Sequence, residues 1–272
     1  MKVYDAASIR NIAIVGHGGC GKTQLVSALL LASGAMNRLG KVDDGSTVTD
    51  FDDESIARKH TLSCSLAHLE WRSQKVNLLD TPGFSNFLAE ARAALRVTEG
   101  VLLCVDAVAG VEVQTEKMWT ESRNLGLPHL VVITRLDRER ASLDRTLESL
   151  QRCCGRDVVP IQIPIGEEAG FTGVIDLVRM KAFSFEPGGT GRMVEGEIPS
   201  ALAARASAAH DALIERVAEA DESLIESFFS QGTLSEEQLV RGLKSGTASG
   251  RLFPALCASG LHAVGCQPLL DA

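Results

Sequence analysis

Residues 16–23 read Gly16-His17-Gly18-Gly19-Cys20-Gly21-Lys22-Thr23, which matches the phosphate-loop pattern GxxxxGK(S/T) at every fixed position. The apolar run at 12–15 just before it predicts a buried strand. Residues 24–33 just after it predict a helix with an apolar face, which ends at Gly34. A strand, a glycine-rich loop and a helix in this order are the setting in which the pattern binds phosphate. The alternative is a glycine-rich turn that binds no ligand.

The residue types in this loop suit a phosphate group. Its four glycines let the backbone curl so that successive N–H groups point inward, and the positive end of the helix dipole adds to their attraction. We expect Lys22 to reach the outer phosphates and the Thr23 hydroxyl to ligate Mg²⁺. Cys20 lies beside Lys22 at the start of the helix, where the pKa of a thiol tends to fall, so we also hypothesise a reactive thiol there.

Composition excludes several classes of protein. With 272 residues, 45% hydrophobic and 23% charged, the chain can bury a sizeable core and disorder is not expected. It contains no run of about twenty apolar residues and no signal-peptide core near its start, so we expect a cytoplasmic protein without a membrane span. A net charge of −8 argues against nonspecific binding to nucleic acid, and we expect no sequence-specific DNA binding. Oligomeric state is left open.

The cysteines and histidines indicate no metal centre. The seven cysteines form no CxxC pair and no zinc spacing, so we expect free thiols. The six histidines share no spacing typical of metal ligands, and we expect scattered structural or surface roles for them.

Strands and helices alternate over the first part of the chain. This order predicts an α/β fold, a P-loop NTPase with a mostly parallel sheet and helices on both faces. Residues 35–60 show little periodicity and predict a long mobile loop, which in a compact domain is usually functional. We expect strands at 61–71, 75–80, 101–105 and 130–133, and helices at 85–97, 112–124 and 142–153.

From residue 158 the pattern changes. Short antiparallel strands are expected around 173–176 and 181–185, a turn or tip at 187–191, and helices at 200–219, 222–230 and 236–244. Residues 252–257 then return to an apolar strand. We therefore expect three parts: a core at 1–157, an inserted α+β subdomain at 158–251, and a return to the core at 252–272. The insertion carries most of the negative charge, with fourteen Asp and Glu against eight Lys and Arg.

Two segments complete the phosphate end of the predicted site. Asp80-Thr81-Pro82-Gly83 follows a buried strand, at the edge where open α/β sheets place ligands. Asp80 is expected to hold a Mg²⁺-bound water, and the N–H of Gly83 to sense the γ-phosphate. Thr61 ends the mobile loop and is expected to close over Mg²⁺. The alternatives are a plain Pro-Gly turn and an ordinary strand threonine.

Two further segments suit a base. Thr134-Arg135-Leu136-Asp137 follows a strand, and a carboxylate at Asp137 can accept the two N–H donors that guanine presents and adenine lacks. Helix capping is the alternative role for Asp137. Ser259-Gly260 follows the returning strand and could offer a backbone N–H to the base.

With these residues assembled, the chain resembles the GTP-binding domain of the elongation factor G family of translational GTPases, over essentially all of its 272 residues. Residues 80–83 resemble the third motif of that family, 134–137 the fourth, and Ser259-Gly260 the fifth. Residues 164–168 and 173–177 resemble the start of the subdomain that the family inserts. The resemblance implies GTP and GDP as substrate and product, Mg²⁺ as cofactor and the ribosome as partner. It also implies that the closing helix at the end of this chain is truncated and that the chain is one domain of a longer protein.

Three departures from the family pattern indicate a divergent branch. Phe84 takes the position of the family's water-positioning histidine, and a phenyl ring can neither accept nor donate the needed hydrogen bond. Thr134 and Arg135 replace the Asn and Lys of the fourth motif, although Arg135 can still lie flat on a base. Gly19 replaces an Asp. We expect a GTPase that is slow without its partner, with catalysis by Lys22, Thr61 and Gly83.

Two alternative functions remain. One is a nucleotide-gated module that binds GTP or GDP and scarcely hydrolyses it, which Phe84 favours. The other is an ATP-using P-loop enzyme, in which Asp137 would have no role.

Overall fold

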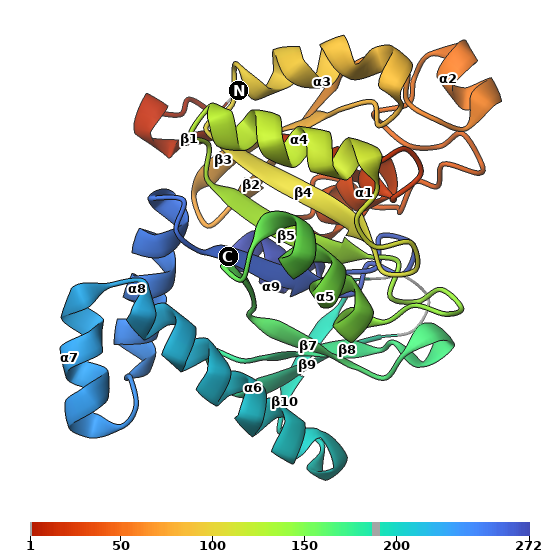
Figure 1. Cartoon of the computed structure of the whole chain (residues 1–272). Helices are drawn as coiled ribbons and strands as arrows, with labels where there is room; N and C mark the ends of the chain where they lie inside the picture. The colour runs from red at the N-terminus through yellow and green to blue at the C-terminus, as the bar shows by residue number, and fades with distance from the viewer. Residues whose placement is uncertain (1, 187–190) are drawn as a thin grey trace.

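The chain was analysed as a computed structural model, which describes residues 2–186 and 191–272 (Figure 1). Over these residues the strands form a seven-stranded sheet of order β2-β3-β1-β4-β5-β11-β6 and a four-stranded sheet of order β10-β9-β8-β7. The larger sheet is parallel except for β2, which runs antiparallel to β3. Its strands are β1 (Ile9–Gly16), β2 (Ser65–Trp71), β3 (Gln74–Asp80), β4 (Gly100–Asp106), β5 (His129–Thr134), β6 (Val158–Pro160) and β11 (Phe253–Cys257). The predicted mostly parallel α/β fold is confirmed.

Helices cover both faces of the larger sheet, because alternate residues of each central strand face opposite sides. Ala13 and Val15 of β1 belong to a core shared with α3 (Leu88–Leu95), α4 (Val113–Asn124) and α5 (Leu143–Cys154). Ile14 belongs to a second core on the other face, with α1 (Lys22–Ala32) and α9 (Cys266–Asp271). The sheet is therefore buried on both sides, and its loops at the carboxyl ends of the strands remain to form a site.

The smaller sheet is antiparallel and carries three helices. It consists of β7 (Gln162–Ile165), β8 (Gly173–Asp176), β9 (Lys181–Phe185) and β10 (Met193–Gly196), followed by α6 (Ser200–Glu219), α7 (Glu222–Gln231) and α8 (Glu236–Ala248). Val217 of α6 and Leu239 of α8 are fully buried in the same core as Phe253 of β11, so the two sheets share one continuous hydrophobic core.

Several expected boundaries shift. Residues 158–160 form β6, which pairs with β11 in the larger sheet, so the smaller sheet begins only at Gln162. The division of the chain into parts at 1–157, 158–251 and 252–272 remains a proposal. Helix α8 runs to Ala248, four residues beyond the expected end at 244. These residues continue the buried face of the helix through Gly246.

The segment expected to be a loop at 35–60 contains a helix, α2 (Asp53–Arg58). Asp52 caps it, because its carboxylate accepts a hydrogen bond from the N–H of Glu54. Six residues are too few to show a helical period, which explains why periodicity missed this helix. The strand expected from residue 61 begins at Ser65.

The helix expected at 85–97 begins as a 3₁₀ turn, η2 (Ser85–Phe87), before α3. Two further 3₁₀ turns are η1 (Ala6–Ser8) and η3 (Glu168–Gly170). The turn expected at 187–191 lies outside the described residues except for Gly191. None of the helices in the described ranges combines the length and apolar composition that a bilayer span requires.

Candidate functional site

The loop at 16–23 connects β1 to α1 and depends on glycine. Gly16, Gly19 and Gly21 have φ angles of 147°, 81° and 93°, a region that other residues rarely adopt. A Cβ on Gly16 would lie only 2.3 Å from the carbonyl oxygen of Cys104 on the neighbouring strand β4. At Gly16 in particular, the curled backbone of the loop leaves no room for a side chain.

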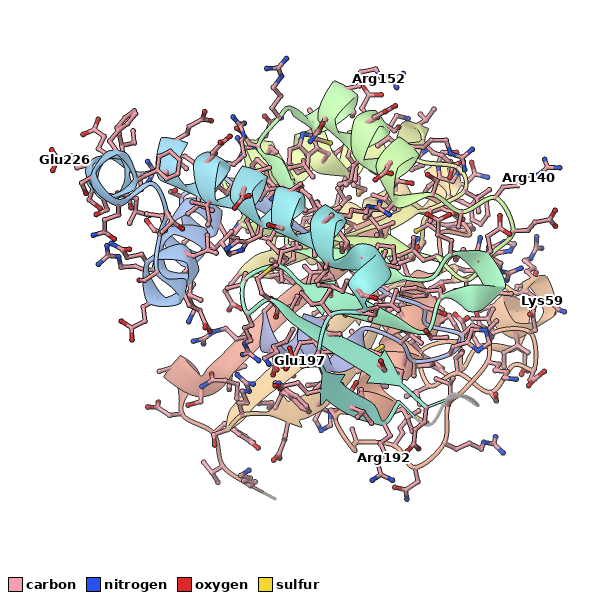
Figure 2. All side chains as sticks on the ribbon, turned by 90° about the horizontal axis from the view of Figure 1, so that it is seen from below. Lys59, Arg140, Arg152, Arg192, Glu197 and Glu226 are labelled. Atoms are coloured by element: carbon pink, nitrogen blue, oxygen red, sulfur yellow. The ribbon has the colours of Figure 1, made fainter. Side chains whose placement is uncertain are left out.

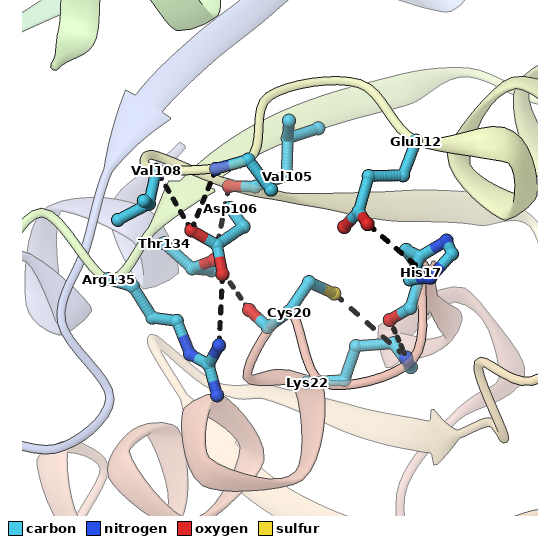
Figure 3. Close-up of polar contacts among 10 residues, drawn as sticks. His17, Cys20, Lys22, Val105, Asp106, Val108, Glu112, Thr134 and Arg135 are labelled. Carbon is cyan, nitrogen blue, oxygen red and sulfur yellow. Dashed lines mark hydrogen bonds and ion pairs between the residues drawn. The ribbon is translucent and has the colours of Figure 1, made fainter. Parts of the chain in front are cut away.

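Lys22 begins α1 and turns back over this loop (Figure 3). Its buried ammonium group donates hydrogen bonds to the carbonyls of His17, at 2.8 Å, and Gly16, at 3.2 Å. Gly83 lies against the same group, because a Cβ there would be 2.4 Å from Lys22 Nζ and 2.6 Å from the N of Gly18. The structure therefore brings together the predicted phosphate loop and the loop after β3.

A cluster of hydroxyls and carboxylates lies beside Thr23. The hydroxyls of Thr23 and Thr61 are 2.9 Å apart, and Thr61 donates to Asp50 Oδ1 at 2.9 Å. Asp80 ends β3 and accepts a hydrogen bond from Thr49 Oγ1 at 2.8 Å. All five side chains are buried. The structure thus brings together Thr23 and Thr61, which are 38 positions apart in the sequence.

One atom of this cluster has no partner. Asp80 Oδ1 is buried and makes no hydrogen bond to any of the residues that the structure describes. Burial raises the pKa of Asp80 to about 6, against which the hydrogen bond from Thr49 acts. Mg²⁺ prefers oxygen ligands, and a carboxylate oxygen without a partner next to two hydroxyls provides them. The residues present therefore fit a Mg²⁺ ion.

Asp137, which is predicted to bind the base, lines the same pocket as Lys22 and Thr23. The side chain of Asp137 is only 7% exposed, and its Oδ2 is 3.9 Å from Nε2 of His262. Gly260 packs against α1, since a Cβ there would lie 2.8 Å from the backbone of Gln24. The Ser259 hydroxyl accepts a hydrogen bond from the N–H of His262, so this side chain shapes the turn.

Thr134 and Arg135 fasten the base side to the phosphate loop (Figure 3). The Thr134 hydroxyl donates to the carbonyl of Cys20 at 2.6 Å. The guanidinium of Arg135 forms an ion pair with Asp106 at 2.9 Å, and it lies over Gly21, where a Cβ would be 3.6 Å from Arg135 Nε. The shorter Thr134 thus makes a contact to the loop in spite of the departure from the family pattern.

Phe84 lies at the rim of the pocket with 40% of its surface exposed. Its ring covers Gly18 so closely that a Cβ on Gly18 would be 2.7 Å from it. The ring of His60 is the aromatic neighbour of Phe84, with 4.8 Å between the ring centroids.

These segments enclose one pocket with a volume of about 260 Å³. Predicted residues that line it are Gly18, Gly19, Gly21, Lys22, Thr23, Thr61, Gly83, Phe84, Thr134, Arg135, Asp137 and Gly260. Five predicted residues are not among its lining residues, namely Gly16, His17, Cys20, Asp80 and Ser259. The pocket lies far from α7: Figure 2 shows Lys59, which lines the pocket, and Glu226, on α7, at opposite ends of the molecule.

The hypothesis of a reactive Cys20 is wrong. Its thiol is 1% exposed, and burial raises its pKa although Lys22 is near. The attraction of Lys22 was visible in the sequence, but the desolvation of the thiol arises only from packing against β4.

Several residues of the site gave no signal in the sequence. Thr49 and Asp50 lie in the segment without periodicity, and Asp106 is a strand-end residue like many others. Gln24 links three segments, since its side chain donates to the carbonyls of Gly40 and Gly260 and accepts from the N–H of Val42. A polar residue directly after the phosphate loop was the only clue to this role.

Comparisons with known proteins identify the family of this chain. The profile described as "Elongation factor Tu GTP binding domain" matches residues 7–272. The elongation factor G of Thermotoga petrophila is 35% identical over 271 residues, and that of Granulibacter bethesdensis is 35% identical over 273 residues. Both matches cover all of this chain and 39% of the relative, so the chain spans about two fifths of the length of these curated relatives.

A solved structure of a protein from Thermus thermophilus has the same fold. It superposes with a TM-score of 0.89 and 37% sequence identity, and the match covers 98% of this chain and 40% of that one. The chain described here therefore belongs to the elongation factor Tu GTP-binding domain family, with elongation factor G among its relatives.

Proposed function

We propose that this chain is the GTP-binding and GTP-hydrolysing domain of an elongation factor G-like translation factor, which acts as a nucleotide switch on the ribosome in the cytoplasm. The observation that carries the proposal is the single pocket in which the phosphate loop, the Thr23–Thr61 pair and Asp137 meet. The pocket brings phosphate-binding groups and a guanine-binding carboxylate together from distant parts of the chain. This is the arrangement that binding of one guanine nucleotide requires.

Each residue has a role in this proposal. The N–H groups of residues 16–21 and the ammonium of Lys22 hold the phosphates, and their fixed positive charge stabilises the negative charge of the transition state. Thr23, Thr61 and Asp80 would hold Mg²⁺, whose positive charge would neutralise phosphate oxygens. The N–H of Gly83 contacts the γ-phosphate, so the loop after β3 and the loop before Thr61 can respond to its loss.

The base side determines the choice of nucleotide. Asp137 accepts the two N–H donors of guanine, and adenine leaves this buried carboxylate without a partner. Loss of a hydrogen bond to a buried charged group reduces the binding free energy by roughly 1.5–3 kcal/mol or more, which is about tenfold to a hundredfold in affinity. Arg135, held by Asp106, and the backbone at Gly260 complete the walls around the base.

Competition for a fluorescent GDP analogue tests the nucleotide class. We expect GDP to displace the probe and ADP to fail at the same concentration. Asp137→Ala should weaken GDP binding by about tenfold or more. Asp144→Ala is the matched control, because Asp144 pairs with Arg205 on the surface away from the pocket. Equal displacement by ADP and GDP would contradict the proposal.

A second function is favoured by Phe84, namely a GTP/GDP-binding module with little hydrolysis. Multiple-turnover phosphate release, with and without ribosomes, separates the two. A switch of the translational type should release phosphate slowly alone and faster with ribosomes, whereas the module should remain at background in both. Rapid release by the free chain that is unchanged in Phe84→Ala would refute the prediction of slow turnover.

A further inference from the structure

A histidine outside the predicted site residues lies directly before Thr61 in the chain. His60 lies between the end of α2 and Thr61, and its ring is 4.8 Å from the ring of Phe84. It lines the pocket together with Lys22, Gly83 and Thr61. Among the pocket-lining residues of the described ranges, His60 is the only histidine.

The imidazole of His60 is fixed in one tautomer. Its Nδ1 is 2.7 Å from the carbonyl oxygen of Arg58, and a carbonyl can only accept a hydrogen bond. In the neutral ring the proton therefore resides on Nδ1, and Nε2 keeps its lone pair as an acceptor. The ring of Phe84 is apolar and offers no acceptor. Of the two neighbouring rings, therefore, only the imidazole of His60 can bind a water molecule.

The backbone also holds His60 in place. Its N–H donates to the carbonyl of Ser55 in α2 at 3.2 Å, and the next residue, Thr61, is tied to Thr23 and Asp50. The ring therefore depends on the same loop that brings Thr61 to Thr23. When this loop lies over the pocket, the imidazole and the threonine arrive together.

We propose that His60 positions the attacking water through Nε2 and thereby takes the part for which Phe84 lacks a hydrogen-bonding group. This inference rests on the proposed function, since it concerns GTP hydrolysis in the same pocket. In that reaction the water oxygen forms a bond to the γ-phosphorus, and the bond from that phosphorus to the β–γ bridging oxygen breaks. The electron pair stays on the oxygen of GDP, and a proton of the water ends on the released phosphate. Whatever turnover the chain achieves depends on this imidazole.

Three substitutions separate hydrogen bonding from packing. His60→Phe keeps an aromatic ring against Phe84 and removes the acceptor, His60→Gln keeps an acceptor without the ring, and His60→Ala removes both. His68→Ala is the matched control, because His68 is exposed on β2 away from the pocket. Single-turnover hydrolysis of GTP labelled at the γ-phosphate gives the rate, and a fluorescent GTP analogue gives the affinity.

We expect His60→Phe and His60→Ala to hydrolyse GTP about tenfold more slowly or worse, because positioned acid–base groups typically contribute at least tenfold to a rate. Their affinity for GTP should stay within about twofold of wild type. His60→Gln should be faster than His60→Phe, and His68→Ala should match wild type. Wild-type hydrolysis in His60→Phe would overturn the inference and leave the proposed GTPase intact. Absence of hydrolysis by the wild-type chain both with and without ribosomes would overturn the proposed GTPase together with this inference, and the two failures are thereby distinguished.

Discussion

At the scale of single residues, burial decides how a titratable group behaves. Asp80 and His129 are both almost completely buried, and both are shifted toward their neutral forms, as the pKa of each shows. Asp80 retains an unpartnered oxygen beside Thr23, which suits a cation. His129 lies instead in an aromatic cluster with Trp119 and Phe253, and its Nε2 is 2.6 Å from the Ser122 hydroxyl. Burial thus shifts the pKa of Asp80 in a candidate ligand site and that of His129 in the hydrophobic core.

His129 predicts a pH dependence of stability. Burial, and then the charge of Arg123, lowers the pKa of His129 to about 4 in the folded chain, against about 6.5 when unfolded. Below pH 6.5 only the unfolded chain takes up this proton, so stability falls as the pH drops toward 4. Between about pH 7 and about pH 5 the loss amounts to about 2 kcal/mol.

Urea unfolding of wild type and His129→Leu at both pH values measures this term. The difference in unfolding free energy between the two chains should shrink by about 2 kcal/mol on going from about pH 7 to about pH 5. His68→Leu, at an exposed position, should show no such change. A constant difference for His129→Leu would show that the pKa of this ring is the same in the folded and unfolded chains.

At the scale of elements, the helix ends carry local stability. Helix α8 begins with a capping box in which the Ser235 hydroxyl accepts from the N–H of Gln238, and the Gln238 side chain accepts from the N–H of Ser235. Because α8 packs through Leu239 and Gly242 onto α6, its first turn supports the smaller sheet and not the pocket. Changes there should affect stability without affecting nucleotide binding.

Ser235→Ala tests this separation. It removes one half of the capping box and should lower the free energy of unfolding by about 1 kcal/mol. Affinity for GDP should remain unchanged. Ser245→Ala, on the exposed side of the same helix, should be neutral or slightly stabilising, because alanine is the better helix former. A loss of GDP affinity in Ser235→Ala would contradict the independence of the helix and the pocket.

At the scale of the whole molecule, one hydrophobic core runs from the larger sheet to the helices of the smaller one. Ala13, Trp119, Phe253 and Val217 belong to this single cluster. The pocket and α7 lie at opposite ends of the molecule, as Lys59 and Glu226 show in Figure 2. A ligand bound at one end should therefore stabilise the entire fold.

Thermal unfolding with GDP and Mg²⁺ tests this coupling. At about a hundredfold excess over the dissociation constant, GDP should add about 2.7 kcal/mol, which raises the melting temperature by several degrees in a single transition. ADP at the same concentration should cause no shift, and removal of Mg²⁺ with EDTA should reduce the shift due to GDP. Two transitions, of which only one moves with GDP, would show that the parts unfold separately.

The amino-acid pattern alone was sufficient for the fold class and for much of the site. Residues 16–23, 80–83 and 134–137 could be placed because glycine, hydroxyl and carboxylate groups stand at characteristic positions just after apolar strands. Such local patterns can be recognised without any knowledge of packing. The helix α2 and the strand β6 were not predicted, because each is too short to show a period.

Only the tertiary structure determined the contacts between distant segments. Thr49 with Asp80, Gln24 with Gly40 and Gly260, and His60 with Phe84 join parts of the chain whose spacing carries no signal. The same holds for Cys20, whose charged neighbour in the sequence matters less than the strand that buries it. Burial and long-range contact arise from how the chain packs, and for that reason local sequence could not reveal them.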